Sequence, residues 1–281
     1  MTSSYSRGGV LKVLRLFYLG EPLLCPDFFS ILHMACVEGI TERIEISTNA
    51  SMLSHERSGK FLEAVRGFAG EVYLRISIYS VYQKKNESIT KSKMPVEEIR
   101  QNIEGFMALR NAERETFRHV HVYAKILDSY SQENEDFLQT YGSLVDEVEI
   151  EQPMNWSGDG ERNLLADAYD ESLAGKLEQE TMPKVCAYPF HTLAIQSDGK
   201  VVCCCVDWSR KTCVGDVTKE SLVDIWNGDA LQKLRLQHLS GHREANEACR
   251  NCHHLPHGGS YEKDSLDTLT PDEFLRRETK I

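Results

Sequence analysis

Four cysteines after residue 185 constrain the fold of this chain more than any other feature. Cys186 is followed by twelve residues, then Gly199, then four more residues before Cys204, and Cys249 and Cys252 form a Cys-x-x-Cys pair 45 positions after Cys204. Thiolates grouped in this way bind a tetrahedral zinc ion or an iron–sulfur cluster. We therefore expect the segments that carry Cys186, Cys204, Cys249 and Cys252 to converge on one metal centre.

The composition excludes several classes of function. Lys and Arg total 32 against 43 Asp and Glu, giving a net charge of −11, which argues against a nucleic-acid-binding surface. No apolar run has the length of a membrane span, and the first residues lack the apolar core of a signal peptide. We expect a cytoplasmic protein with no membrane contact. In that reducing compartment clustered cysteines are more often metal ligands than disulfides, and the total of nine is odd.

The first 155 residues alternate strand-like and helix-like patterns. The expected strands cover residues 11–18, 42–48, 72–78, 119–127 and 145–150, and four helices lie between them. This alternation is typical of a parallel sheet with right-handed crossovers. A doubly wound sheet and an open β/α barrel both satisfy it, so the pattern predicts the α/β class and leaves the winding undecided.

Polar residues gather where these strands end. Gly20-Glu21-Pro22 follows the first strand, Ser47-Thr48-Asn49 ends the second, and Ser77 ends the third. Chemistry in parallel α/β proteins collects beyond the carboxyl ends of the strands. These seven residues are the candidate cofactor-binding site.

The turn at residues 19–22 and the cysteine-rich part each resemble a known protein family. Leu19-Gly20-Glu21-Pro22 is similar to the Gly-Gly-Glu-Pro motif of radical S-adenosylmethionine (radical SAM) enzymes, with Leu19 in place of the first glycine. The cysteine-rich part, with Asp198-Gly199, Gly215-Asp216 and Ile225-Trp226-Asn227-Gly228, resembles the SPASM domain, an auxiliary iron–sulfur module of many such enzymes. The resemblance implies a partial (incomplete) parallel β/α barrel followed by a small cysteine-rich SPASM domain.

The resemblance also assigns roles. Gly20, Glu21 and Pro22 would hold the amino group of S-adenosylmethionine, the segment 47–49 would face its ribose, and Ser77 would lie near its carboxylate. The four cysteines would bind one auxiliary [4Fe-4S] cluster. Relatives modify a peptide or small-molecule substrate by hydrogen abstraction and take electrons from a donor.

One family feature does not occur in the 281 residues. Radical SAM enzymes carry a Cys-x-x-x-Cys-x-x-Cys loop after their first strand, and nothing in this sequence matches it. We expect a fragment of a radical enzyme, in which S-adenosylmethionine binds only weakly unless the loop is present. The alternative is a non-catalytic interaction module that binds an iron–sulfur cluster, or zinc, and has lost the radical cluster.

The expected domain organisation is a partial barrel at 1–158, a linker at 159–182, the SPASM-like domain at 183–255 and a polar tail at 256–281. The roles of three further cysteines are left open, although Cys205 also matches a SPASM cysteine and is an alternative ligand or a neighbour of the ligands. Cys203 and Cys205 are expected on the opposite face of a strand from Cys204, because successive residues of a strand alternate in direction. Cys213 has no family counterpart.

Overall fold

The computed structural model describes residues 10–127, 131–151, 184–250, 252 and 266–278. The described residues up to 151 form one compact unit, and those from 184 onward form a second. The expected linker at 159–182 lies outside the described residues, and the expected domain boundaries stay a prediction.

The first unit contains a five-stranded parallel sheet. Its strands are β1 (Leu14–Arg15), β2 (Arg43–Thr48), β3 (Glu71–Ile78), β4 (Val120–Leu127) and β5 (Glu147–Glu151). They lie in the order β1-β2-β3-β4-β5, so each strand pairs with its predecessor in the chain. A doubly wound sheet reverses its strand order at a switch point, whereas a β/α barrel does not. The order therefore selects the barrel type of winding.

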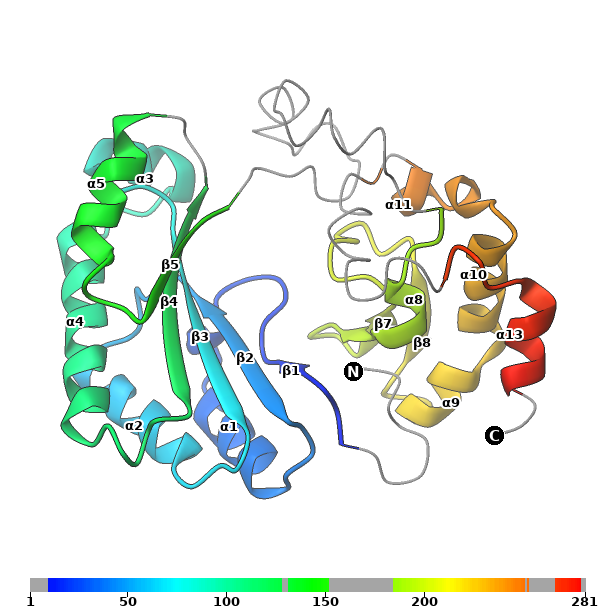
Figure 1. The fold of residues 1–281 in the computed structure, drawn as a ribbon, viewed down its shortest axis with the longest axis horizontal. Coiled ribbons are helices and arrows are strands. Elements are labelled where there is room, and N and C mark those ends of the chain that lie inside the picture. The colour runs from blue at the N-terminus through cyan, green and yellow to red at the C-terminus, as the bar shows by residue number, and fades with distance from the viewer. Residues whose placement is uncertain (1–9, 128–130, 152–183, 251, 253–265, 279–281) are drawn as a thin grey trace. The chain divides into compact units, whose positions relative to one another are not determined.

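Helices cover one face of this sheet (Figure 1). They are η1 (Pro22–Leu24), α1 (Phe28–Val37), α2 (His55–Val65), α3 (Gln83–Thr90), α4 (Val96–Ala112) and α5 (Gln132–Tyr141). The hydroxyl of Ser54 caps α2 by accepting from the Arg57 amide, a role for which serine is favoured at helix starts. Helix α3 is additional to the four helices expected between the strands. Its eight residues are mostly polar and include a single apolar side chain, Ile89, so they show no helical apolar pattern.

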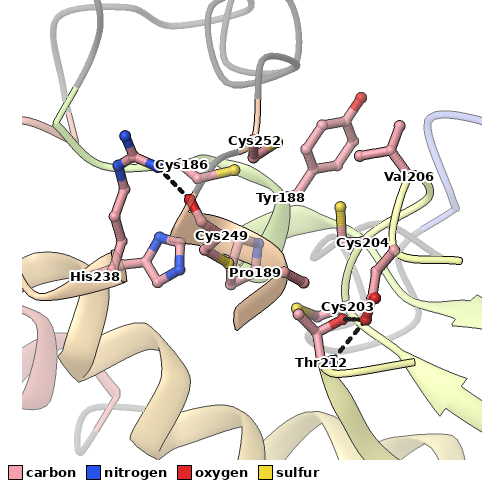
Figure 2. A pocket seen from close by; sticks show the side chains of 13 residues that line it. Cys186, Tyr188, Pro189, Cys203, Cys204, Val206, Thr212, His238, Cys249 and Cys252 are labelled. Atoms are coloured by element: carbon pink, nitrogen blue, oxygen red, sulfur yellow. Dashed lines mark hydrogen bonds between the residues drawn. The ribbon is translucent and has the colours of Figure 1, made fainter. Parts of the chain in front are cut away.

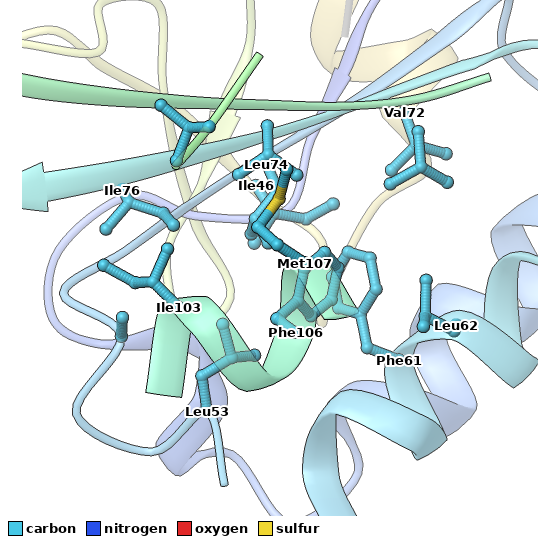
Figure 3. Close-up of a cluster of buried hydrophobic side chains, with 14 of the residues drawn as sticks. Ile46, Leu53, Phe61, Leu62, Val72, Leu74, Ile76, Ile103, Phe106 and Met107 are labelled. Atoms are coloured by element: carbon cyan, nitrogen blue, oxygen red, sulfur yellow. The ribbon is translucent and has the colours of Figure 1, made fainter. Parts of the chain in front are cut away.

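The sheet has one apolar and one polar face. Residues at alternating positions of β2, β3 and β4, such as Ile46, Leu74 and Val122, are fully buried against the helices. Figure 3 shows this core, in which the rings of Phe61 and Phe106 meet edge to face at 5.4 Å. The residues between them, among them Ser47, Arg75 and Lys125, are polar and lie on the opposite face.

An ion pair fastens α4 to the sheet. The guanidinium of Arg110 donates to both carboxylate oxygens of Asp146, at 2.9 and 2.7 Å, and also to the Val120 carbonyl at 2.8 Å. The Val122 amide donates to the same carboxylate at 2.8 Å. Arg110 is 4% exposed and Asp146 28%, so the pair is shielded from solvent.

The second unit is small and built around an antiparallel sheet of three short strands, β6 (Ala194–Ile195), β7 (Lys200–Val202) and β8 (Cys213–Asp216). Its helices are α8 (Tyr188–His191), α9 (Leu222–Asn227), α10 (Asp229–Leu239), η2 (Arg243–Ala245), α11 (Glu247–Arg250) and α13 (Pro271–Glu278). Ser221 and Asp224 form a capping box at the start of α9. Gly199 turns the chain between β6 and β7 with φ of +84°, a conformation that favours glycine.

A ring contact joins the C-terminal helix to this unit. The ring of Phe274 in α13 packs edge to face on Phe190 at 5.6 Å. Thr270 and Glu273 form a capping box at the start of this helix. Among the described residues no helix combines the length and apolarity that crossing a bilayer requires.

Candidate metal centre and strand-end site

The four cysteines expected to bind metal come from three different parts of the second unit. Cys186 precedes α8, Cys204 follows β7, and Cys249 lies in α11 with Cys252 just after it. All four line one pocket of about 490 Å³, open solvent at its mouth included (Figure 2). The tertiary structure thus brings together residues that are up to 66 positions apart in the sequence.

Buried polar contacts hold the segments that carry these cysteines. Asp207, 1% exposed, accepts from the amide and hydroxyl of Thr212 at 2.6 and 2.7 Å, which closes the loop after β7. Arg235 of α10 donates to the carbonyls of Pro189 and Trp226 at 2.9 and 3.1 Å, which joins α10 to α8 and α9. These contacts position the pocket walls without using the cysteine sulfurs.

The pocket disfavours free thiolates. Burial raises the pKa of Cys186 and of Cys249 to about 12, and burial raises that of Cys204 well above its usual range. The neighbouring cysteines raise them further, because each thiolate would repel the next. A bound cation reverses this balance, since metal binding deprotonates a coordinating thiol.

The sulfurs surround a space and do not meet at a point. Within the described ranges no three His, Cys, Asp or Glu side chains are grouped so that they could hold one metal ion as they stand. A single zinc ion requires four sulfurs, each about 2.3 Å from the metal. Side-chain rotation is therefore needed before these residues could hold a metal ion.

Cys203 corrects one sequence-based expectation. Strand β7 ends at Val202, so residues 203–205 lie in a turn and the alternation rule for strands does not apply. Cys203 is 1% exposed and lines the same pocket as Cys204. Cys205 is not among the residues lining the pocket, and Cys213 is exposed at the start of β8.

His238 also lines the pocket, and the sequence analysis missed it. It lies in α10 on the stripe that includes Leu231 and Leu234, and it is 1% exposed. Burial lowers the pKa of this imidazole to about 4. A histidine at helical spacing from two buried leucines was the signal that could have found it.

The strand-end residues of the first unit meet around Glu21. Its carboxylate accepts hydrogen bonds from the Thr48 hydroxyl at 2.6 Å, the Asn49 amide at 2.8 Å and the Leu23 amide at 3.1 Å. Gly20, with φ of +92°, turns the chain before Glu21, and Pro22 begins η1. The turn after β1 and the end of β2 therefore form one hydrogen-bonded cluster.

The other predicted residues lie on the neighbouring strand ends. The hydroxyls of Ser47 and Ser77 are 3.4 Å apart, and Arg75 donates to Ser47 at 3.2 Å. Asn49 and Ser77 both line a second pocket, of about 460 Å³ with open solvent included, whereas Gly20, Glu21 and Pro22 do not line it. The seven residues share one edge of the sheet and do not all face one cavity.

Comparison with known proteins bears on both units. Residues 186–253 match the family profile of SPASM, described as an iron-sulfur cluster-binding domain. This segment is a SPASM domain. The S-adenosyl-L-methionine-dependent 2-deoxy-scyllo-inosamine dehydrogenase of Niallia circulans is 27% identical to the chain over 70 residues. That match spans 25% of this chain and 28% of the relative.

Solved structures resemble the chain over a longer stretch. Hexahistidine-tagged anSMEcpe with bound AdoMet has a TM-score of 0.52 at 12% identity, over 98% of this chain and 79% of that one. BtrN in complex with AdoMet and 2-DOIA has a TM-score of 0.48 at 18% identity, over 85% and 72%. The first likeness concerns the fold. The predicted fold class is confirmed: a radical SAM-type partial barrel is followed by the SPASM domain.

Proposed function

We propose that the SPASM domain holds one auxiliary [4Fe-4S] cluster through Cys186, Cys204, Cys249 and Cys252. The observation that carries this proposal is that these four cysteines, distant in sequence, line one pocket within the segment that matches the family profile. When bound, such a cluster supplies a one-electron carrier. The chain's own residues provide four sulfur ligands and a largely apolar wall that limits the access of water.

The family match favours a cluster over the zinc alternative. Four thiolates suit either group, but the profile that residues 186–253 match is described as an iron-sulfur cluster-binding domain. We propose a cytoplasmic location, because clustered cysteines that serve as metal ligands are typical of a reducing compartment.

Iron and acid-labile sulfide in the reconstituted protein test the cluster. We expect about four of each per chain, with broad absorbance near 400 nm. Cys204→Ser should lose most of the iron, and Cys213→Ser, at an exposed cysteine outside the pocket, should keep it. Cys203→Ser decides which of the two adjacent pocket cysteines is the ligand. Zinc without sulfide in the wild-type protein would refute the cluster.

We propose further that the strand-end cluster around Glu21 binds S-adenosylmethionine weakly. A carboxylate has about four acceptor sites, and Glu21 uses three of them on Leu23, Thr48 and Asn49. Acceptor capacity therefore remains for an ammonium group. Equilibrium dialysis with labelled S-adenosylmethionine tests this site: Glu21→Gln should weaken binding, and Glu115→Gln at an exposed position should not.

The reaction proposed for this fold is radical modification of a peptide or small molecule, with electrons from a donor. It requires the three-cysteine loop, which the 281 residues do not contain. An extended chain that carries this loop should form 5′-deoxyadenosine when reduced. A second candidate is a non-catalytic iron–sulfur module that binds a partner, and failure of the extended chain to cleave S-adenosylmethionine would support it.

A further inference from the structure

His238 is a buried polar side chain with no hydrogen-bond partner among the described residues. Its exposed fraction is 1%, and both ring nitrogens are buried and unpaired there. Figure 2 shows the ring reaching from α10 into the pocket that the cysteines line. An unpaired buried imidazole is costly, because its nitrogens lose their hydration and gain nothing in return.

The position of the His238 ring indicates which group could be its hydrogen-bond partner. The ring opens into the space bounded by Cys186, Cys204, Cys249 and Cys252, where the described residues offer no polar group that pairs with it. Sulfurs of a bound iron–sulfur cluster and its thiolates are hydrogen-bond acceptors. A cluster in this pocket would therefore offer His238 the partner that the described protein atoms lack.

We propose that His238 donates an N–H hydrogen bond to the iron–sulfur cluster or to one of its cysteine thiolates, and so raises the reduction potential of the cluster. The proposal rests on the proposed function, in which the four cysteines hold the cluster. His238 acts here as a positioning and tuning residue, not as a ligand, since four thiolates already complete the ligand set.

The donor role does not depend on the charge of the ring. A neutral imidazole carries one N–H and a protonated one carries two, so a donor is present in either form. Arg243 lines the same pocket, and its guanidinium donates to the Cys249 carbonyl at 2.5 Å. Arg243 thus fixes the backbone of Cys249, a proposed ligand. His238 is placed to contact a sulfur atom in the pocket.

The sign of the effect follows from electrostatics. Reduction adds one negative charge to the cluster, and a hydrogen-bond donor stabilises the more negative state. Loss of the donor should therefore make the cluster harder to reduce. We expect up to about a tenfold change in the reduction equilibrium, which corresponds to about 59 mV for a one-electron couple.

The test compares the reconstituted wild-type protein with His238→Leu, His238→Gln and His238→Asn. Leucine removes the donor. Glutamine places an amide N–H near the position of Nε2, and asparagine places one near the position of Nδ1. His242→Leu, at an exposed histidine four positions on, is the matched control. Iron and sulfide are measured first, because their absence from the wild-type protein would refute the cluster itself.

An EPR-monitored redox titration then measures the potential. With iron content unchanged, we expect a lower potential in His238→Leu, recovery in one of the two amide variants and no change in His242→Leu. A His238→Leu protein with full iron content and the wild-type potential would overturn the proposal.

A spectroscopic measurement on the wild-type protein covers the case in which the variants do not fold. Pulsed EPR on the reduced cluster with ¹⁵N-labelled histidine should show a weak nitrogen coupling together with an exchangeable proton. A strong coupling would indicate a histidine ligand in place of a hydrogen-bond donor, and no coupling would exclude every histidine, His238 included, from contact with the cluster. Either result would overturn the donor role.

Discussion

The carboxylate of Glu21 accepts a hydrogen bond from the hydroxyl of Thr48 at 2.6 Å, and this bond joins the turn after β1 to the end of β2. The Asn49 amide donates to the other carboxylate oxygen at 2.8 Å. Glu21 therefore holds together the strand ends that form the proposed cofactor site. Its role in the protein alone is structural, and binding of an ammonium group would be added to that role.

Thr48→Val should destabilise the first unit by about 2 kcal/mol, because it removes a hydrogen bond to a charged group from a buried position. Valine has the shape of threonine, so packing changes little. Urea unfolding followed by circular dichroism measures the loss. Thr48→Ser keeps the hydroxyl and is the control for the loss of the methyl group; wild-type stability in Thr48→Val would show that the bond to Glu21 contributes nothing.

Asp146→Asn should lower the free energy of unfolding by about 2 kcal/mol at neutral pH, because it leaves the buried guanidinium of Arg110 without its counter-charge. Glu113→Gln, in an exposed pair with Arg66, should have a much smaller effect.

The difference between wild type and Asp146→Asn should depend on pH. Burial acts to raise the pKa of Asp146, but the bonds from Arg110 and Val122 outweigh it and hold the pKa below its usual range. A lowered folded-state pKa stabilises the fold above the unfolded value of about 3.9, and this contribution is lost as the pH falls through the folded-state value. Denaturant unfolding between pH 7 and pH 2 should show the two proteins converging in acid. A constant difference would contradict this linkage.

Gly215→Ala should destabilise the SPASM domain by about 1–3 kcal/mol, because the new methyl group would lie 2.5 Å from Cγ1 of the buried Ile225. Gly105→Ala, inside α4 with no atom within 4 Å of the new methyl group, should instead stabilise by about 0.5–1 kcal/mol. Thermal unfolding measures both. The opposite signs separate a steric clash from the general effect of replacing glycine.

Removal of iron should loosen the SPASM domain selectively. Its sheet consists of three short strands, and the proposed ligands come from three separate segments, so we expect metal binding to be coupled to folding there. After chelation we expect faster amide hydrogen exchange in residues 200–216 and unchanged protection in β2, β3 and β4, which have their own core. Equal protection in residues 200–216 with and without iron would argue against a structural role for the cluster.

Much of the fold could be predicted because local patterns agree with it. The apolar alternation in 42–48 and 72–78, and the cap at Ser54, identify two strands and a helix close to their observed bounds. The first strand is shorter than expected, since only Leu14–Arg15 pair as a strand with β2 and Leu11 adds an isolated bridge. Helix α3 escaped prediction because its polar residues give no apolar stripe.

The α/β class, the four cysteine candidates and the residues at the strand ends follow from the sequence alone, because periodicity and spacing are local properties of the chain. The sequential strand order, the place of Cys203 in the cysteine pocket and the unpaired burial of His238 emerge only in the folded protein. Each of these depends on contacts between segments distant in sequence. Which segments meet is set by the packing of their side chains, and no short stretch of sequence contains that information.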